Sequence, residues 1–309
     1  MKTGREKRHP AQRARALLAA ASMLALCAAC AGTLAPPPPV PPNWEPVITR
    51  QGVLPMGSGH LQGCCVTSNA IYGTLTDGLY KFDWYGRLLK CVVTKRHQGD
   101  ICWWNGRLYT AVSGEQKTPG FRGRIDVWDE ELRRVGRVEL EKSADGITCL
   151  DGVLYVGLGP VRDPERPNRG NWFGKFDAET LKPLCEPFVV DHGYDVCAGV
   201  QNLCTDGERI YMCVYTPEED YPCFFAMDRD LKVHESHVFG WRHGVDVVGG
   251  GEPGAVRFIY ALTINCWSQA SRLKVDPSTS QTLFRYAELK DGRFGDITRY
   301  IKFDREKKR

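Results

Sequence analysis

The sequence has few long apolar runs, and this scarcity sets the first limits on the protein. The one extended apolar stretch spans residues 16–29, close to the N-terminal end, and it is shorter than a typical membrane span. Beyond it, no segment shows a convincing apolar period of 3.6 residues, so long amphipathic helices are not expected. With 42% apolar and 25% charged residues, the chain suits a folded body with a substantial core.

Motifs of several function classes are also missing. There is no HExxH motif, no phosphate-binding glycine loop and no nucleophile elbow, and the glycines at 249–251 are read as a turn because no helix follows them. The 13 cysteines include no CxxC pair.

Most of the cysteines in the body of the chain lie in apolar, strand-like sequence, where cysteine behaves as a small hydrophobic residue. Their disulfide pairing cannot be deduced from the sequence.

A charge excess of one sign is absent from the body of the chain. The formal net charge is +4, but the first 30 residues contain six basic side chains against one acidic side chain. The rest of the chain therefore has a net charge of about −1. Binding to nucleic acid needs a basic surface that this composition does not supply, so we expect no nucleic-acid partner.

The first 30 residues have the order of an export signal. A basic segment ends at Arg15, the apolar stretch follows, and small residues surround Cys30. The stretch "LCAAC" resembles the lipid-attachment site of bacterial lipoproteins, with Cys27 where that family usually has leucine. The resemblance implies a lipid on Cys30 and a location in the bacterial cell envelope, in the periplasm or at the cell surface. Plain secretion is the alternative.

Proline is concentrated in "APPPPVPPNWEP", residues 35–46. A segment of this composition forms an extended spacer, which suits a domain held away from a membrane. We therefore divide the chain into a signal peptide at 1–30, a proline-rich linker at 31–46, a folded body at 47–303 and a charged tail at 304–309.

The body contains a repeat. Five segments share an apolar alternation that ends in aspartate and is followed by a turn and a further strand; the aspartates are Asp83, Asp129, Asp177, Asp228 and Asp276. A strand with one aligned tyrosine precedes each segment; the tyrosines are Tyr72, Tyr109, Tyr155, Tyr211 and Tyr260.

This repeat predicts that each unit forms four short strands, with Asn-Gly or Asp-Gly hairpin turns in the middle three units. Four-stranded units of about 47 residues are typical of propeller blades. We therefore predict an all-β, five-bladed β-propeller of four-stranded antiparallel blades. Five equivalent aspartates indicate turn caps that accept backbone N–H groups rather than catalytic groups.

Two stretches resemble propellers of known families. The sequences "HLQGCCVTSNAIYGTLTDGLYKFD" and "HQGDICWWNGRLYTAVS" resemble the first two blades of plant-type glutaminyl cyclotransferases, and the strand starts are similar to those of gluconolactonase-like propellers. The resemblance covers most of residues 60–276 and implies the propeller fold. The catalytic glutamate of the cyclotransferases corresponds to Gly99 here, so that catalytic residue is not shared.

The first strands of the units surround the channel, so their starting residues should converge at its mouth. We expect His97 and Asp100 at the rim of a pore rather than in a core. The loops after the second strands share this face. The candidate ligand-binding residues are His60, Gln62, His97, Asp100, Asp145, Arg169, Trp172, Gln201, Asn202, His243, Asp246, Asn265 and Trp267.

Three classes of function stay open at this point. The first is binding of a small polar ligand, such as a sugar or a peptide, at the channel mouth. The second is an enzyme (a hydrolase, a lyase or a cyclotransferase-like protein) that uses acid–base or metal chemistry. Its catalytic candidates are His97, Asp100, Asp145 and Asp246, and a divalent metal ion would be held by His60, His97 and His243. The third is a protein-interaction scaffold. We expect a monomer that contacts the membrane only through its lipid anchor.

Overall fold

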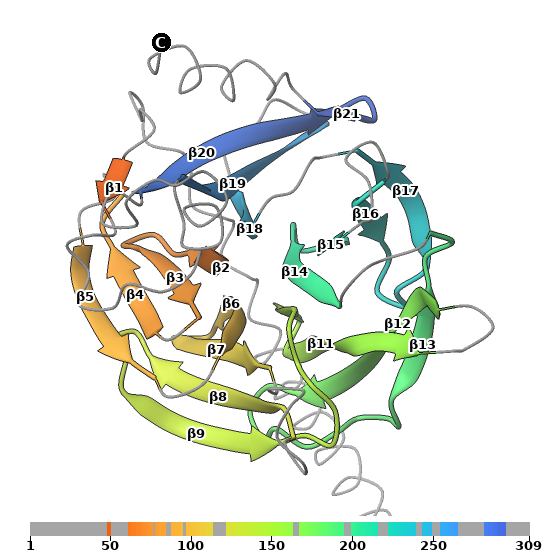
Figure 1. The fold of residues 1–309 in the computed structure, drawn as a ribbon, viewed down its shortest axis with the longest axis horizontal. Helices are drawn as coiled ribbons and strands as arrows, with labels where there is room; N and C mark the ends of the chain where they lie inside the picture. The colour runs from red at the N-terminus through yellow and green to blue at the C-terminus, as the bar shows by residue number, and fades with distance from the viewer. Residues whose placement is uncertain are drawn as a thin grey trace, which may run out of the picture. The chain divides into compact units, whose positions relative to one another are not determined.

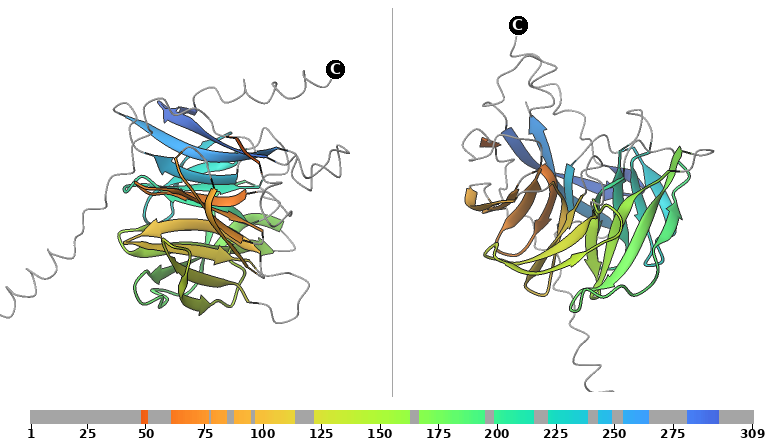
Figure 2. Two further views of the ribbon diagram at one scale, coloured as in Figure 1. Left: turned by 90° about the vertical axis from the view of Figure 1, so that its left-hand side faces the viewer. Right: turned by 60° about the horizontal axis from the view of Figure 1, so that its bottom comes forward.

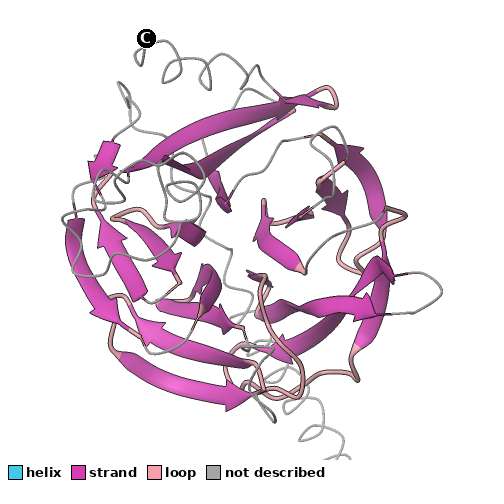
Figure 3. Ribbon diagram, in the orientation of Figure 1, coloured by secondary structure: helices cyan, strands magenta, loops and turns pink. Residues whose placement is uncertain are grey.

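The computed structural model shows five antiparallel β-sheets arranged in a ring. The structure describes residues 48–50, 61–76, 78–84, 88–94, 97–113, 122–162, 167–194, 199–215, 222–238, 243–248, 254–264 and 281–294. The chain divides into two units, residues 1–35 and 36–309, and every described residue belongs to the second. The elements of this described part are all strands (Figure 3). It contains no helix that is long and apolar enough to cross a membrane.

Four of the sheets follow the chain, each with four consecutive strands ordered from the centre of the ring outward (Figure 1). Figure 2 shows the same blades from two further sides. This arrangement confirms the predicted five-bladed, all-β propeller. The strands of blades 1 to 4 are β2 (Leu61–Val66), β3 (Ile71–Leu75), β4 (Gly78–Phe82) and β5 (Leu88–Val93); β6 (Gln98–Trp104), β7 (Arg107–Val112), β8 (Arg124–Asp129) and β9 (Arg134–Glu139); β10 (Ile147–Leu150), β11 (Val153–Arg162), β12 (Pro167–Asp177) and β13 (Phe188–Asp191); and β14 (Val200–Thr205), β15 (Ile210–Val214), β16 (Phe224–Met227) and β17 (Val233–His237).

Blade 5 is built from both ends of the chain. Its inner strands are β18 (His243–Val248), β19 (Ala255–Ile264) and β20 (Gln281–Lys290). The outer position is taken by β1 (Ile48–Arg50), which pairs with one end of β20, while β21 (Arg293–Phe294) pairs with the other end. The N-terminal strand therefore closes the ring.

The sequence repeat was misread in this blade. We expected the segment after the turn at Asp276 to form the outer strand, following a third strand that ended at Asp276. Instead β20 pairs directly with β19, from Ala255↔Lys290 to Ile264↔Gln281, so it is the third strand of its sheet. Asp276 lies outside the described residues.

The repeated aspartates Asp129, Asp177 and Asp228 cap turns, as predicted. Oδ1 of Asp129 accepts two backbone N–H groups, each at 2.9 Å. Asp177 and Asp228 accept backbone N–H groups of their own turns at 2.7–3.0 Å. These carboxylates have the turn-capping role that five equivalent copies suggested.

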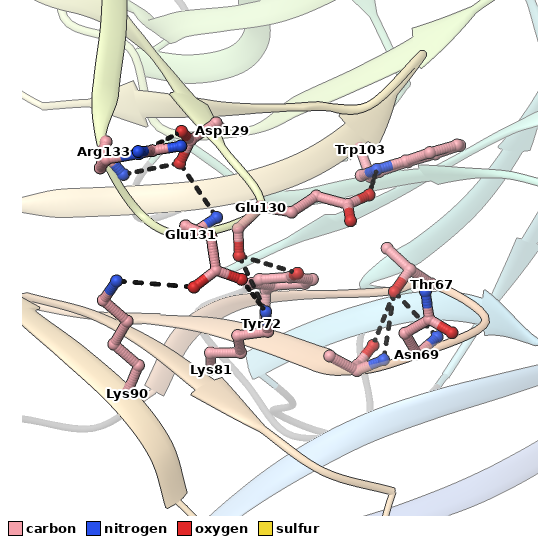
Figure 4. A network of polar contacts seen from close by, with 11 residues as sticks. Thr67, Asn69, Tyr72, Lys81, Lys90, Trp103, Asp129, Glu130, Glu131 and Arg133 are labelled. Atoms are coloured by element: carbon pink, nitrogen blue, oxygen red, sulfur yellow. Dashed lines mark hydrogen bonds and ion pairs between the residues drawn. The ribbon is translucent and has the colours of Figure 1, made fainter.

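Two of the aligned tyrosines, Tyr72 and Tyr109, fasten their blade to the next, whereas the hydroxyl of Tyr211 donates to Oδ2 of Asp206 within its own blade at 2.6 Å. The hydroxyl of Tyr72 donates to the carbonyl of Glu130 at 3.1 Å, and that of Tyr109 donates to the carbonyl of Ala178 at 3.0 Å. Both carbonyls belong to the aspartate-capped turn of the following blade. Lys81 Nζ donates to the same Glu130 carbonyl at 3.1 Å, and Figure 4 shows this junction between blades 1 and 2.

The apolar core lies between the faces of neighbouring blades. Between blades 2 and 3 it contains Tyr109, Val127 and Leu154, and between blades 4 and 5 it contains Phe224 and Phe258. Nine cysteines lie in the described part of the chain, and seven of them are buried. Their place in the apolar core agrees with the interpretation of cysteine as a small hydrophobic residue here.

Candidate functional site

The innermost strands of four blades begin with an irregular register. A β-bulge redirects side chains at the end of a strand, and here the bulges lie at the strand starts that were predicted to meet. The side chains and backbone groups next to them are thereby turned toward the centre of the ring. The register shifts fall between Leu61 and Gly63, Gln98 and Ile101, Val200 and Asn202, and His243 and Val245.

Asp100 lies at the centre of the polar contacts that follow from these bulges. Its side chain is fully buried. Oδ2 accepts the N–H of Leu203 at 2.7 Å and the N–H of Ile147 at 3.2 Å, and Oδ1 accepts from Nδ2 of Asn202 at 3.0 Å. Burial raises the pKa of Asp100 well above its usual range, while these hydrogen bonds lower it.

The network reaches the innermost strand of every blade. Nδ2 of Asn202 also donates to the carbonyl of Gln62 at 2.8 Å, and its Oδ1 accepts the N–H of Gly244 at 3.0 Å. Nε2 of Gln201 donates to Oε1 of Gln62 at 3.0 Å. We call Gln62, Asp100, Gln201 and Asn202 the central hub. The hub joins β2, β6, β10, β14 and β18.

The hub corrects one sequence-based expectation. Asp100 was expected at the open rim of a pore, whereas it is buried among donors from blades 3 and 4. Blades 2 and 4 are not neighbours in the ring, so their contact crosses its centre. A buried carboxylate with three donors is stabilised in place, and the side chains of the hub are occupied with one another.

Asp145 lies next to the hub and differs from Asp100. Its carbonyl accepts the N–H of Asp100 at 2.7 Å, but Asp145 as a residue is partly exposed, whereas Asp100 is buried. Desolvation raises the pKa of Asp145 to about 6, against a hydrogen bond from the Ser113 side chain. Ser113 N–H in turn donates to the carbonyl of His97 at 3.2 Å. His97, Ser113 and Asp145 therefore follow one another along the boundary of blades 2 and 3.

A glycine keeps the Asp145 carboxyl uncrowded on one side. A Cβ atom at Gly199 would lie 3.0 Å from Oδ2 of Asp145. A residue with a side chain at this position would make a close contact with the carboxylate, which would have to shift by a few tenths of an ångström. Glycine therefore avoids a close contact with the carboxylate of Asp145, which lies beside the hub.

Asp246 is a second partly exposed acid on an innermost strand. Its Oδ2 accepts the N–H of Val66 from blade 1 at 2.8 Å, and its Oδ1 accepts the N–H of Val247 at 2.9 Å. Desolvation raises the pKa of Asp246 to about 7. Asp145 and Asp246 therefore both titrate closer to neutrality than an ordinary aspartate.

Trp172 was predicted to stack on a ligand. In the structure its ring packs against the core between blades 2 and 3, and Nζ of Lys142 lies 4.5 Å from the ring centroid. A cation in this position uses one face of the ring.

The remaining candidates fall partly or wholly outside the described residues. His60, Asn265 and Trp267 are not described, and for Arg169 and His243 only the backbone is described. Of the three histidines suggested as metal ligands, only His97 has a described side chain. Within the described part of the chain, no group of three or more His, Cys, Asp or Glu side chains is arranged to hold a metal ion.

Sequence reasoning missed Ser113 and the pairing of Asn171 with His192. Ser113 directly follows the second strand of its blade, β7, at the face where the candidates were expected, and this position was the available signal. Nδ2 of Asn171 lies 3.1 Å from Nε2 of His192, and both side chains are buried. The His192 ring packs on Phe225, with 5.2 Å between the ring centroids.

Comparison with known proteins places the fold. No family model and no curated protein matches the chain. A GH43_1 enzyme from Xanthomonas citri, solved in complex with xylose, is 12% identical over 78% of this chain and 92% of its own, with a TM-score of 0.51. The β-xylosidase RS223 is 13% identical over 82% and 98%, with a TM-score of 0.50. At these identities the likeness shows the fold alone: the chain is a five-bladed β-propeller. The resemblance to glutaminyl cyclotransferases stays a prediction.

Proposed function

We propose that the protein binds a small polar ligand, such as a sugar or a peptide, at the channel mouth beside Asp145. The observation that carries the proposal is the state of this carboxyl. The residue is partly exposed, desolvation raises the pKa of its carboxyl to about 6, and Gly199 places no Cβ against its Oδ2. The buried hub lies beside this residue and is joined to it by the hydrogen bond from the N–H of Asp100 to the carbonyl of Asp145. A desolvated acid with a few converging polar groups is typical of ligand sites.

A hydroxyl-rich ligand suits these groups best. An ionised carboxylate accepts hydrogen bonds from hydroxyl groups, and the Ser113 hydroxyl can donate or accept. A propeller of the same fold is known with xylose bound. Because a shared fold does not carry a shared function, that complex guides only the choice of probe.

The test is calorimetric titration with xylose and xylobiose, and with a set of tripeptides, against the protein and its Asp145→Asn variant. We expect the variant to bind at least about tenfold more weakly, a loss of about 1.4 kcal/mol. Asp230→Asn, at a side chain that is 94% exposed in a turn of blade 4, is the matched control and should bind normally. No binding by the unmodified protein, or equal binding by the Asp145 variant, would contradict the proposal.

A second candidate function is acid catalysis by Asp145. Its pKa of about 6 leaves part of the population protonated near neutral pH, as a general acid requires. Ser113 connects Asp145 with His97, because its side chain hydrogen-bonds to the Asp145 carboxyl and its N–H donates to the carbonyl of His97. Hydrolysis of 4-nitrophenyl β-xyloside should then decline as the pH rises through about 6, and Asp145→Asn should abolish it. Activity that persists in this variant would remove Asp145 from the reaction.

We also propose export and lipid attachment at Cys30. The support is the order of basic, apolar and small residues before it. In cell fractionation, Cys30→Ala should move the protein from the membrane fraction to the soluble fraction, while the control Cys27→Ala should leave it membrane-bound. Equal behaviour of the two variants would argue against lipidation of Cys30.

A further inference from the structure

The outer half of blade 2 gathers three arginines around one buried aspartate. Asp126 on β8 is fully buried. Its Oδ2 accepts from Nε of Arg124 at 3.0 Å, with Nη2 of the same guanidinium at 2.9 Å, and its Oδ1 accepts from Nε of Arg137 at 3.2 Å. Nη1 of Arg134 lies 4.0 Å from Oδ2. One carboxylate therefore has three guanidinium groups within ion-pair distance.

The strand register explains why these side chains meet. Alternate residues of a strand point to the same face of the sheet, so Arg124, Asp126 and Trp128 share one face of β8. The neighbouring strand, β9 (Figure 1), adds side chains to this face where its residues stand opposite them. The opposite pairs are Arg124↔Glu139, Asp126↔Arg137 and Trp128↔Arg134.

This face of blade 2 is turned toward blade 1, because Trp128 packs in the core between these two blades. The ligand site proposed above lies at the boundary of blades 2 and 3, so the arginine cluster is a separate site. Arg124 is buried, whereas the side chains of Arg134 and Arg137 are 45% and 39% exposed. The cluster therefore opens to solvent along β9.

The charges of the cluster are not balanced. Oε1 of Glu139 lies 3.8 Å from Nη1 of Arg137, so three guanidinium groups share the two carboxylates of Asp126 and Glu139, with one positive charge in excess. A buried carboxylate is stabilised by a well-placed cation with additional hydrogen bonds, whereas further cations beside it repel one another. A second anion would remove this repulsion.

The exposed guanidinium groups are oriented by their neighbours. Arg134 is too far from Asp126 for a hydrogen bond, but its guanidinium lies 5.8 Å from the centroid of the Trp128 ring, which holds it by a cation–π contact. Arg137 is held through its Nε by Asp126. A guanidinium has five N–H donors, and its planar fork matches the two oxygens of a carboxylate or a phosphate.

We propose that Arg134 and Arg137, supported by the buried Arg124, bind the oxyanion group of a small ligand, a carboxylate or a phosphate. Asp126 is a positioning residue in this site: it holds Arg124 and Arg137 beside each other and contacts the ligand only through them.

The test is calorimetric titration at low ionic strength with inorganic phosphate and, separately, with succinate. We expect saturable binding of at least one of these anions, and the stronger binder identifies the oxyanion. Arg137→Gln should weaken this binding by about tenfold or more, because a charge-assisted pair is lost. Arg133→Gln is the matched control and should bind normally, because Arg133 is in the turn of the same hairpin, 75% exposed and paired with Asp129 at 2.6 Å.

A second variant should act in the opposite direction. Asp126→Asn keeps the size of the side chain and removes the negative charge that competes with the ligand, so we expect a folded variant to bind the anion more tightly, by about threefold or more. Urea denaturation shows whether the variant folds; if it does not, Arg137→Gln decides alone.

Three outcomes would overturn the proposal. The first is no saturable binding of either anion by the unmodified protein. The second is equal affinity in the unmodified protein and Arg137→Gln. The third is weaker binding by a folded Asp126→Asn variant, which would mean that the guanidinium groups do not attract the anion.

Discussion

Three aspartates on innermost strands occupy three different environments. Asp100 is buried and accepts from three donors, so it stabilises the ring. Asp145 and Asp246 are partly exposed, and desolvation raises their pKa values to about 6 and about 7. Burial and the number of donors, rather than the residue type, separate the structural acid from the candidates for binding.

The titration of Asp246 predicts a pH dependence of stability. Its pKa in the folded protein, about 7, is higher than the ordinary value of 3.8, so protonation favours the folded state. This stabilisation is complete below pH about 4 and is lost as the pH rises through about 7. We expect thermal unfolding midpoints measured from pH 4 to pH 8 to fall less steeply in Asp246→Asn than in the unmodified protein. Parallel curves for the two proteins would contradict the assignment, and Asp230→Asn is the control.

The sequence indicated which acids gather at the strand starts but not which of them is buried. The expected convergence of the strand starts placed Asp100 and Asp145 near one another, and the structure agrees. Burial depends on the bulges and on donors from other blades, such as the N–H of Leu203, which lies 103 residues away along the chain. No local pattern in the sequence records such a contact.

At the scale of strands and turns, Tyr72 and Tyr109 differ in whether a second donor remains for the carbonyl that each hydroxyl bonds. Tyr109→Phe removes a donor to the Ala178 carbonyl and should lower the free energy of unfolding by about 1 kcal/mol. Tyr72→Phe should cost less, because Lys81 Nζ still donates to the Glu130 carbonyl. Urea denaturation of both variants measures the difference, and equal losses would mean that Lys81 does not compensate.

Strands and turns were the most predictable elements. The turns at Asn105-Gly106 and Asp151-Gly152 have positive φ at both residues, from 47° to 78°, which asparagine, aspartate and glycine tolerate. The aspartate-capped turns likewise follow from local hydrogen bonding. The strand order of blade 5 could not be found in the same way, because its partners are set by ring closure between distant segments.

At the scale of the whole molecule, β1 closes the ring by pairing with β20 in blade 5. A protein without residues 1–50 loses the pairing of Ile48 with Leu283 and its two neighbours, and it exposes that end of β20. We expect its unfolding midpoint to fall by about 5 °C, with self-association visible in size-exclusion chromatography. A protein without residues 1–46 keeps β1 and should behave like the full chain. Equal midpoints for the two truncations would show that β1 is dispensable.

The hub and the closing strand also set the order in which the protein can fold. The carboxylate of Asp100 can be hydrogen-bonded only after donors that lie 47 and 103 residues further along the chain have folded against it. In the same way, β1 can pair only after β20, near the other end of the chain, has formed. Contacts between such distant segments slow folding, and incomplete rings expose unpaired strands in the meantime. During synthesis the first blades would therefore lack part of their native contacts. The native ring would form in a single late step, after the last blade has been synthesised.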